Sequence, residues 1–234
     1  MSTLNTAATD QHDVPAYRLA LPATLAAIAG YVDACMFLAF AGFFVAQVTG
    51  SFVVAGSELV DTNNGLIFKV LAIPVFILAG MITTCVVRAT DLRHAMAMTL
   101  SLECALLIGL VCTTVLGGSG DITYAPALFG LAAMGVQSAT ARLLLSNFGS
   151  TNVMTTNTTQ LAIELVDSFR ARRATPRLLQ TGSIMLAFLV GVILGGLSYR
   201  TVGLPGLVLP CVVLVGIAAA MLRFSVSHRA KRRA

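Results

Sequence analysis

Long apolar blocks limit what this chain can fold into more than any other feature of its sequence. Six of them lie at 19–60, 66–87, 95–116, 124–166, 183–198 and 204–221. A helix of about 20 residues, each adding about 1.5 Å, crosses the ~30 Å core of a bilayer. Only 11% of the residues are charged, which is too few to cover a water-exposed surface. The sequence therefore predicts an all-α membrane protein.

The distribution of positive charge predicts how the blocks cross the membrane. Basic residues concentrate at 170–177 and 229–233, and Lys and Arg beside a span favour the cytoplasmic side. The loop at 117–121 carries none and is expected outside. The first and fourth blocks are about twice as long as one span. The simplest arrangement has about six transmembrane helices, with each long block adding a broken or re-entrant half-helix. Eight full spans are the main alternative.

Both ends of the chain are expected in the cytoplasm. Residues 1–16 contain no Lys or Arg, unlike the basic start of a cleaved signal peptide, and are expected to form a disordered cytoplasmic tail. Residues 224–234 are expected to form a basic cytoplasmic tail. The net charge of +5 lies at block ends without an aromatic platform or reading motif, so nucleic-acid binding is not expected.

The two long blocks resemble each other, which indicates an internal duplication. Residues 30–34 (Gly-Tyr-Val-Asp-Ala) align with 135–139 (Gly-Val-Gln-Ser-Ala). The tetrapeptide Glu-Leu-Val-Asp occurs at 58–61 and again at 164–167. Chance similarity between apolar segments is the alternative, but a repeated acidic tetrapeptide in a chain with 10 acidic residues favours duplication.

The duplication divides the membrane part into one repeat at 17–117 and a second at 118–223. The spans that follow the long blocks match more loosely, through Phe76 and Phe188. An odd number of crossings in each repeat turns the second upside down relative to the first. Two inverted three-helix repeats with interrupted helices are typical of secondary transporters, which bind their substrate near the midplane between the repeats.

Polar residues inside the apolar blocks are the candidates for function, because an unpaired polar group in hydrocarbon is costly. Asp33 and Glu103 lie well inside the first and third blocks. Each is interpreted either as an ion, proton or substrate site, or as a structural acid hydrogen-bonded to a neighbouring helix. Gln137 and Ser138 are the repeat equivalents of Val32 and Asp33, and we expect them to face the interior.

Two polar runs predict helix starts within the long blocks. The run at 146–160 is rich in Ser, Thr and Asn and cannot face lipid. A helix that starts there, or near Val48, would direct free backbone N–H groups toward a bound anion. The alternative is that these residues form only turns and caps. The residues concerned are Thr49, Gly50, Ser51, Thr155, Thr156 and Asn157.

The remaining reactive side chains predict no chemistry. All five cysteines lie inside apolar blocks without the spacing of metal ligands. No His cluster, Ser/Lys dyad or carboxylate pair is evident in the sequence. We therefore expect no metal site, no cofactor and no enzymatic activity.

At these motifs the chain resembles the YoaK family of bacterial integral membrane proteins, also called the DUF1275 domain, over about residues 17–223. The resemblance rests on 30–34 with Phe37 and Leu38, 48–50, Glu103, 134–137 with Arg142, and 150–159. Ser51 stands where the family tends to have Asn, and Thr156 where it tends to have Gly. The resemblance implies a multi-pass protein of the bacterial inner membrane, without an activity that can be carried over.

The leading functional hypothesis is a small secondary transporter or permease-like protein, with a central site between the repeats for an unknown small solute or ion. The alternative is a non-transporting membrane scaffold or regulatory subunit that binds partners through its basic cytoplasmic surfaces. The lipid bilayer is an expected partner, and whether the protein forms a homo-oligomer is left open. The site would be lined by Asp33, Thr49, Gly50, Ser51, Glu103, Gln137, Ser138, Thr155, Thr156 and Asn157.

Overall fold

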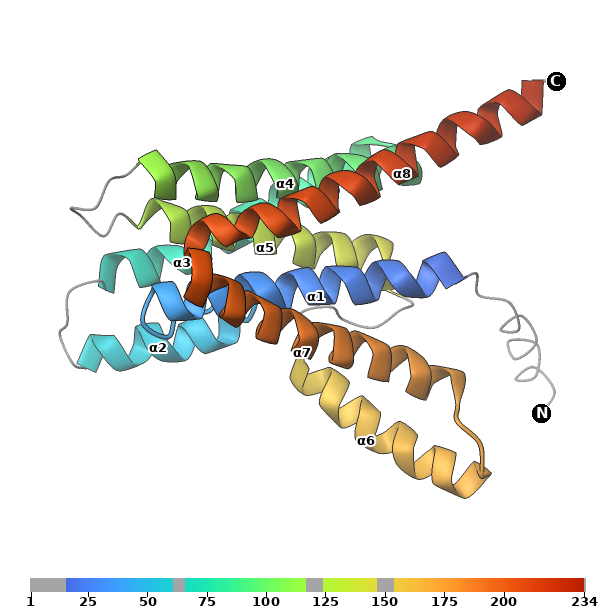
Figure 1. Cartoon of the computed structure of the whole chain (residues 1–234), viewed down its shortest axis with the longest axis horizontal. Coiled ribbons are helices and arrows are strands. Elements are labelled where there is room, and N and C mark those ends of the chain that lie inside the picture. The colour runs from blue at the N-terminus through green and yellow to red at the C-terminus, as the bar shows by residue number, and fades with distance from the viewer. Residues whose placement is uncertain (1–15, 61–65, 117–123, 147–153, 234) are drawn as a thin grey trace.

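The computed structural model describes residues 16–60, 66–116, 124–146 and 154–233, and every regular element in these ranges is a helix. The expected all-α class is therefore confirmed for the described part of the chain. The helices form an elongated bundle (Figure 1). In chain order they are α1 (Ala16–Ala39), α2 (Val48–Val60), α3 (Leu66–Ala89), α4 (Leu92–Leu116), α5 (Ala125–Leu144), α6 (Met154–Ala171), α7 (Pro176–Val202), the 3₁₀ helix η2 (Leu204–Leu207) and α8 (Val208–Arg233).

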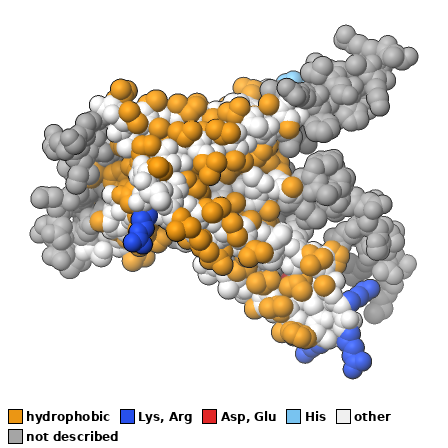
Figure 2. All heavy atoms as spheres, viewed as in Figure 1, with side chains coloured by type: hydrophobic (Ala, Val, Ile, Leu, Met, Phe, Trp, Pro, Cys, Tyr) orange, Lys and Arg blue, Asp and Glu red, His pale blue; other side chains and the backbone are white. Residues whose placement is uncertain are grey.

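Five of these helices, α1, α3, α4, α5 and α7, are long and apolar enough to cross a membrane by length and composition. A shorter apolar stretch follows at Leu204–Ala220. With 13 residues, α2 spans only about 20 Å, less than the ~30 Å core. Apolar side chains cover much of the visible face of the bundle (Figure 2), as a surface in contact with lipid requires. The chain is thus a helical membrane protein with several spans.

The first long block forms one full-length helix and one helix of about half that length. After α1 the chain turns through Ala41 (φ 48°) and Gly42 (φ 92°), and the buried side chains of Phe43 and Val45 follow. α2 then starts beside α1 and ends on the side where α1 also ends (left in Figure 1). The fourth block similarly divides into α5 and α6, and α6 runs toward the right of the view.

Glycines allow two pairs of helices to pack with their backbones in close contact. Gly191 and Gly195 of α7 form a Gly-x-x-x-Gly pair, and a Cβ on either would collide with the α1 backbone at Ala27 or Tyr31. Such small-residue stripes bring membrane helices together. Gly191 lies against Ala27 and Gly195 lies against Tyr31. Because both residue numbers increase in the same direction, α1 and α7 run parallel. The Oη of Tyr31 also donates a 2.9 Å hydrogen bond to the carbonyl oxygen of Gly206.

The second helix pair reproduces the first. Gly30 of α1 packs on the backbone of α7 at Phe188, and Gly135 of α5 packs on the backbone of α3 at Phe76. The sequence comparison aligns Gly30 with Gly135 and Phe76 with Phe188. Gly30 and Phe76 belong to the first half of the chain, and Gly135 and Phe188 to the second, so each of these two glycines packs on a helix from the other half.

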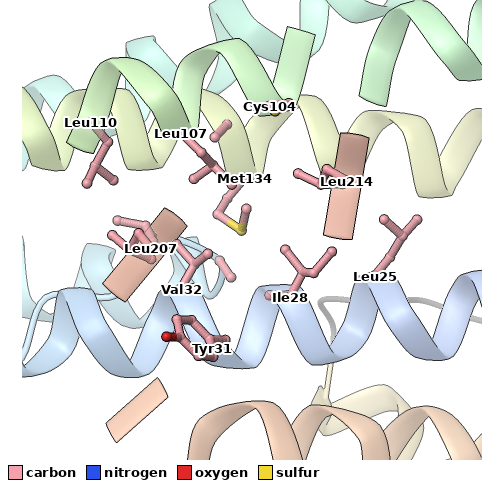
Figure 3. Packing of buried hydrophobic residues seen from close by; sticks show 14 of the residues in the cluster. Leu25, Ile28, Tyr31, Val32, Cys104, Leu107, Leu110, Met134, Leu207 and Leu214 are labelled. Carbon is pink, nitrogen blue, oxygen red and sulfur yellow. The ribbon is translucent and has the colours of Figure 1, made fainter. Parts of the chain in front are cut away.

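The centre of the bundle is an apolar core between α1 on one side and α4 and α5 on the other. Leu207 of η2 and Leu214 of α8 fill the space between them (Figure 3). The remaining labelled residues are Leu25, Ile28, Tyr31 and Val32 of α1, Cys104, Leu107 and Leu110 of α4, and Met134 of α5. This core encloses the polar residues described below.

We predict that Gly191→Ala destabilises the fold, because the new Cβ would lie 2.8 Å from the carbonyl carbon of Ala27. Gly196→Ala is the matched control on the same helix, since no atom lies within 4 Å of its Cβ position. In a helix interior, replacement of Gly by Ala otherwise stabilises by roughly 0.5–1 kcal/mol. Thermal unfolding in detergent should show a lower midpoint for Gly191→Ala and an unchanged or higher one for Gly196→Ala. Equal midpoints would contradict the close contact of α1 with α7.

Candidate functional site

Asp33 holds the segment that connects α1 to α2. Its Oδ1 accepts hydrogen bonds from the backbone N–H groups of Val45 (2.7 Å) and Ala46 (2.8 Å). The side chain is buried, with 3% of its surface exposed. It lies six residues, or about 9 Å, before the end of α1. A non-helical segment inside a membrane must have its backbone groups satisfied by the protein, and Asp33 does this for two of them.

The start of α2 is fixed by contacts with the same segment. The Oγ of Ser51 donates to the carbonyl oxygen of Phe44, and Gly50 packs against the Phe44 ring, where a Cβ would lie 2.9 Å from Cδ2. Thr49 is exposed. The helix start expected near Val48 is thus found, with Thr49, Gly50 and Ser51 inside its first turn. The N–H groups just before it bind the protein's own carboxylate, so Asp33 occupies the place that the sequence suggested for an external anion.

Glu103 is the most isolated polar residue that the structure describes. It lies on α4 with 0% of its surface exposed, and neither carboxyl oxygen has a hydrogen-bond partner among the described residues. Cys211 of α8 lies close enough for an electrostatic interaction with it. An acidic side chain in this position is costly for the fold. Stability alone therefore gives no reason for its presence.

Gln137 links α5 to α1. It is fully buried, and its Nε2 donates a 2.5 Å hydrogen bond to the carbonyl oxygen of Leu25. Its Oε1 has no partner in the described part of the chain. The interior position expected for Gln137 is confirmed. The neighbouring Ser138 is half-buried and also has an interaction partner.

The residues expected on the second polar run lie apart from these. α6 starts at Met154, so Thr155, Thr156 and Asn157 form its first turn. Thr155 and Thr156 are exposed, whereas Asn157 is buried. α6 packs mainly on α7, at a distance from the core around Glu103 and Gln137. The structure therefore groups Asp33 with Ser51 and Gly50, and places the threonines on a separate helix.

Sequence reasoning missed the role of Glu164. Its carboxylate accepts hydrogen bonds from the Nε2 of Gln160 (2.8 Å) and the Oγ1 of Thr175 (2.9 Å). Thr175 is the N-cap of α7 and accepts a bond from the N–H of Leu178. Glu164 is the first residue of the second Glu-Leu-Val-Asp tetrapeptide. This tetrapeptide lies inside α6, which continues to Ala171. The acid therefore stabilises the α6–α7 turn, a role that only the fold reveals.

Positive charge gathers at one end of the bundle, which we call the arginine-rich end. It comprises the ends of α3, α5 and α6 and the start of α7 (right in Figure 1). The exposed arginines there are Arg88, Arg142, Arg170, Arg172, Arg173 and Arg177. Arg142 lies in the last turn of α5, whereas Asp33 lies near the opposite end of the bundle, where α1 ends. Arg200, in the last turn of α7, lies at the opposite end.

These groups define what the interior can bind. Four buried acceptor oxygens have no donor among the described residues: Asp33 Oδ2, both carboxyl oxygens of Glu103, and Gln137 Oε1. Such a set favours a proton, a cation or a donor-rich solute over an anion. The described residues contain no group of three or more His, Cys, Asp or Glu side chains that could hold a metal ion.

We predict that Asp33→Leu releases residues 43–47, because two buried N–H groups lose their acceptor at a cost of about 1–3 kcal/mol each. Asp33→Asn keeps an acceptor oxygen at the same place and should retain the segment. Hydrogen–deuterium exchange of peptides covering 43–47 should be faster in Asp33→Leu and close to wild type in Asp33→Asn. Thr24→Val, which removes a hydroxyl bonded within α1, is the control. Unchanged exchange in Asp33→Leu would show that the carboxylate does not hold the segment.

Comparison with known proteins adds a family to this description. No curated protein and no solved structure matches the chain. Residues 21–220 match a family described as a protein of unknown function (DUF1275). This match covers all of the described spanning helices from Leu21 onward and includes Asp33, Glu103 and Gln137. The chain therefore belongs to the DUF1275 family of helical membrane proteins.

Proposed function

We propose that this protein is a small secondary transporter of the bacterial inner membrane, built from two inverted three-helix repeats with six crossings. The observation that carries the proposal is the set of buried, partnerless acceptor oxygens on Glu103 and Gln137. Ionisable residues inside a membrane are rare and mark ion or substrate pathways. A purely structural core would be more stable with apolar side chains at both positions.

Contacts between the helices support the inverted repeat. Gly30 packs on Phe188 while its repeat equivalent Gly135 packs on Phe76. α1 and α5 run in opposite directions along the bundle, and α2 and α6 point toward opposite ends (Figure 1). Exchange of partners together with reversal of direction is the relation that an inverted repeat requires.

Charge supports an orientation with the arginine-rich end in the cytoplasm. Arg172, Arg173 and Arg177 border the α6–α7 turn and are exposed, and Lys and Arg in short loops are retained inside. α1 starts and α8 ends at this same end (Figure 1). The start of α1 and the end of α8 would therefore both lie in the cytoplasm. Arg200 is then an arginine on the outer side.

The scaffold alternative rests on a different observation. α6 and the start of α7 project from the rest of the bundle (Figure 1), and the positively charged side chains at their turn are visible at one end of the molecule (Figure 2). Such a surface suits an acidic partner in the cytoplasm. A binding surface for a soluble partner does not explain why Glu103 is buried in the core. We therefore prefer the transport function to the scaffold function.

Uptake into proteoliposomes tests the proposal. Vesicles containing a pH-sensitive dye are mixed in turn with amino acids, sugars, organic amines and alkali cations. We expect at least one class to change the internal pH in the presence of wild-type protein and not in empty vesicles. Glu103→Gln should slow that change by about tenfold or more, since a contact to a charged group contributes about 1.5–3 kcal/mol.

Thr24→Val serves as the control for uptake, because its hydroxyl bonds only within α1. It should transport at the wild-type rate. Folded wild-type protein that moves none of these solutes, and that co-purifies with a soluble partner in fixed proportion, would overturn transport in favour of the scaffold.

A further inference from the structure

Two unsatisfied groups in the core occupy the same level of the bundle. Leu110 of α4 packs against Gly130 of α5, where a Cβ would lie 3.2 Å from its Cδ1. α4 and α5 are consecutive and run antiparallel (Figure 1). Seven residues back along α4 is Glu103, and seven residues forward along α5 is Gln137. Both steps equal about 10.5 Å and return to nearly the same helix face.

That shared face looks into the interior of the bundle. The Cβ position of Gly130 also lies 3.5 Å from Met36 Cε and 3.5 Å from Val45 Cγ1, which belong to α1 and the segment after it. Leu107 and Met134, one turn before this level, are neighbours in the core (Figure 3). Glu103 and Gln137 follow them on the inner faces of α4 and α5, and both have 0% of their surface exposed.

Few titratable groups surround this level. α8 contributes Cys211, whose backbone carbonyl accepts a 3.6 Å bond from the thiol of Cys104. α5 contributes Gln137 and no titratable side chain on this face, because Arg142 is exposed at its end. From α3, Cys85 and Arg88 are exposed. Among the residues whose side chains the structure describes, no Lys or Arg is bonded to Glu103.

The number and kind of atoms select the ligand. Glu103 Oε1, Glu103 Oε2 and Gln137 Oε1 are all acceptors and lack donors among the described residues. Hard divalent cations take six or more oxygen ligands, twice what this site supplies. One proton converts Glu103 from an acceptor into a donor, and a bond from its O–H to Gln137 Oε1 satisfies both residues.

We propose that Glu103 and Gln137 form a proton-binding pair, in which the protonated carboxyl of Glu103 donates to Oε1 of Gln137. The step is a proton transfer alone: a hydronium ion gives one proton to a carboxylate oxygen of Glu103, one O–H bond of hydronium breaks as the new O–H bond forms, and a water molecule is left. The inference rests on the proposed transport function, for which it supplies the coupled ion.

The pair also suggests how the proton acts on the fold. Gln137 Nε2 donates a hydrogen bond to the carbonyl oxygen of Leu25 on α1. α1 also contains Asp33, which binds the segment before α2. Loss of the proton places a carboxylate opposite Gln137 Oε1, and two acceptors repel each other. Without the proton, the hydrogen bond between Glu103 on α4 and Gln137 on α5 is lost. Because Gln137 also binds α1, the connection between α4 and α1 would depend on the proton.

Infrared spectroscopy of the full chain in lipid vesicles, without any solute, tests the pair. Across a series of pH values we expect a carbonyl stretch from a protonated carboxylic acid that is absent in Glu103→Gln. In Gln137→Leu the same band should shift to higher frequency, because the carbonyl group of a free acid vibrates faster than that of a hydrogen-bonded one. Asp33→Asn should leave this component of the spectrum unchanged.

Three results would overturn the pair: a band that persists in Glu103→Gln, a band that does not shift in Gln137→Leu, or a band that disappears when Na⁺ or K⁺ is added at constant pH. The two variants are independent, so one is sufficient if the other does not fold. A Glu103 band in a protein that moves no solute would contradict transport and leave the proton site in place.

Discussion

The structure depends on one constraint, that backbone N–H groups at membrane depth must find a partner within the protein. Asp33 meets it for Val45 and Ala46 with a single carboxylate oxygen. This contact lets the chain leave α1, turn back and start a second, shorter helix without exposing its backbone to lipid. The double length of the first apolar block follows from it, and so does the position of α2. A buried acidic side chain, which by itself would destabilise the fold, thus allows the helix to be interrupted after α1.

Small residues carry the next level of organisation. Gly191 and Gly195 bring α7 onto α1, and Gly30 and Gly135 pack on the helix backbone at Phe188 and Phe76, each in the other half of the chain. Without a hydrophobic driving force between membrane helices, such close packing holds them together. It also leaves the inner faces of α4 and α5 turned toward the core, where Glu103 and Gln137 are buried. The glycines position the polar pair without touching it.

Much of this architecture could be predicted from the sequence. The lengths of the apolar blocks predict spanning helices, and the polar runs predict the helix starts found at Val48 and Met154. The sequence aligns Gly30 with Gly135, and both glycines pack closely on the backbone of another helix. The partners of the polar residues could not be predicted. Asp33 reaches its N–H groups only because the chain turns through Ala41, a non-glycine residue at positive φ. Glu164 depends on Thr175 across a helix turn, and the common level of Glu103 and Gln137 depends on the register of α4 against α5.

The central claim is that the re-entrant half-helix expected in the first apolar block is formed by residues 40–60, which enter the membrane after α1 and return with α2 to the side where α1 ends. Single cysteines at Ala41, Ser57 and Ala174, in a background without the five native cysteines, test it with a thiol reagent that does not cross membranes. α1 and α2 both end on the side opposite to the arginine-rich end. Ala41 follows the last residue of α1 by two positions, Ser57 lies in the last turn of α2, and Ala174 lies in the α6–α7 turn. The account predicts labelling of Ala41→Cys and Ser57→Cys from one side and of Ala174→Cys from the other. Labelling of Ala41→Cys and Ser57→Cys from opposite sides would show that α2 crosses the membrane and would contradict the account.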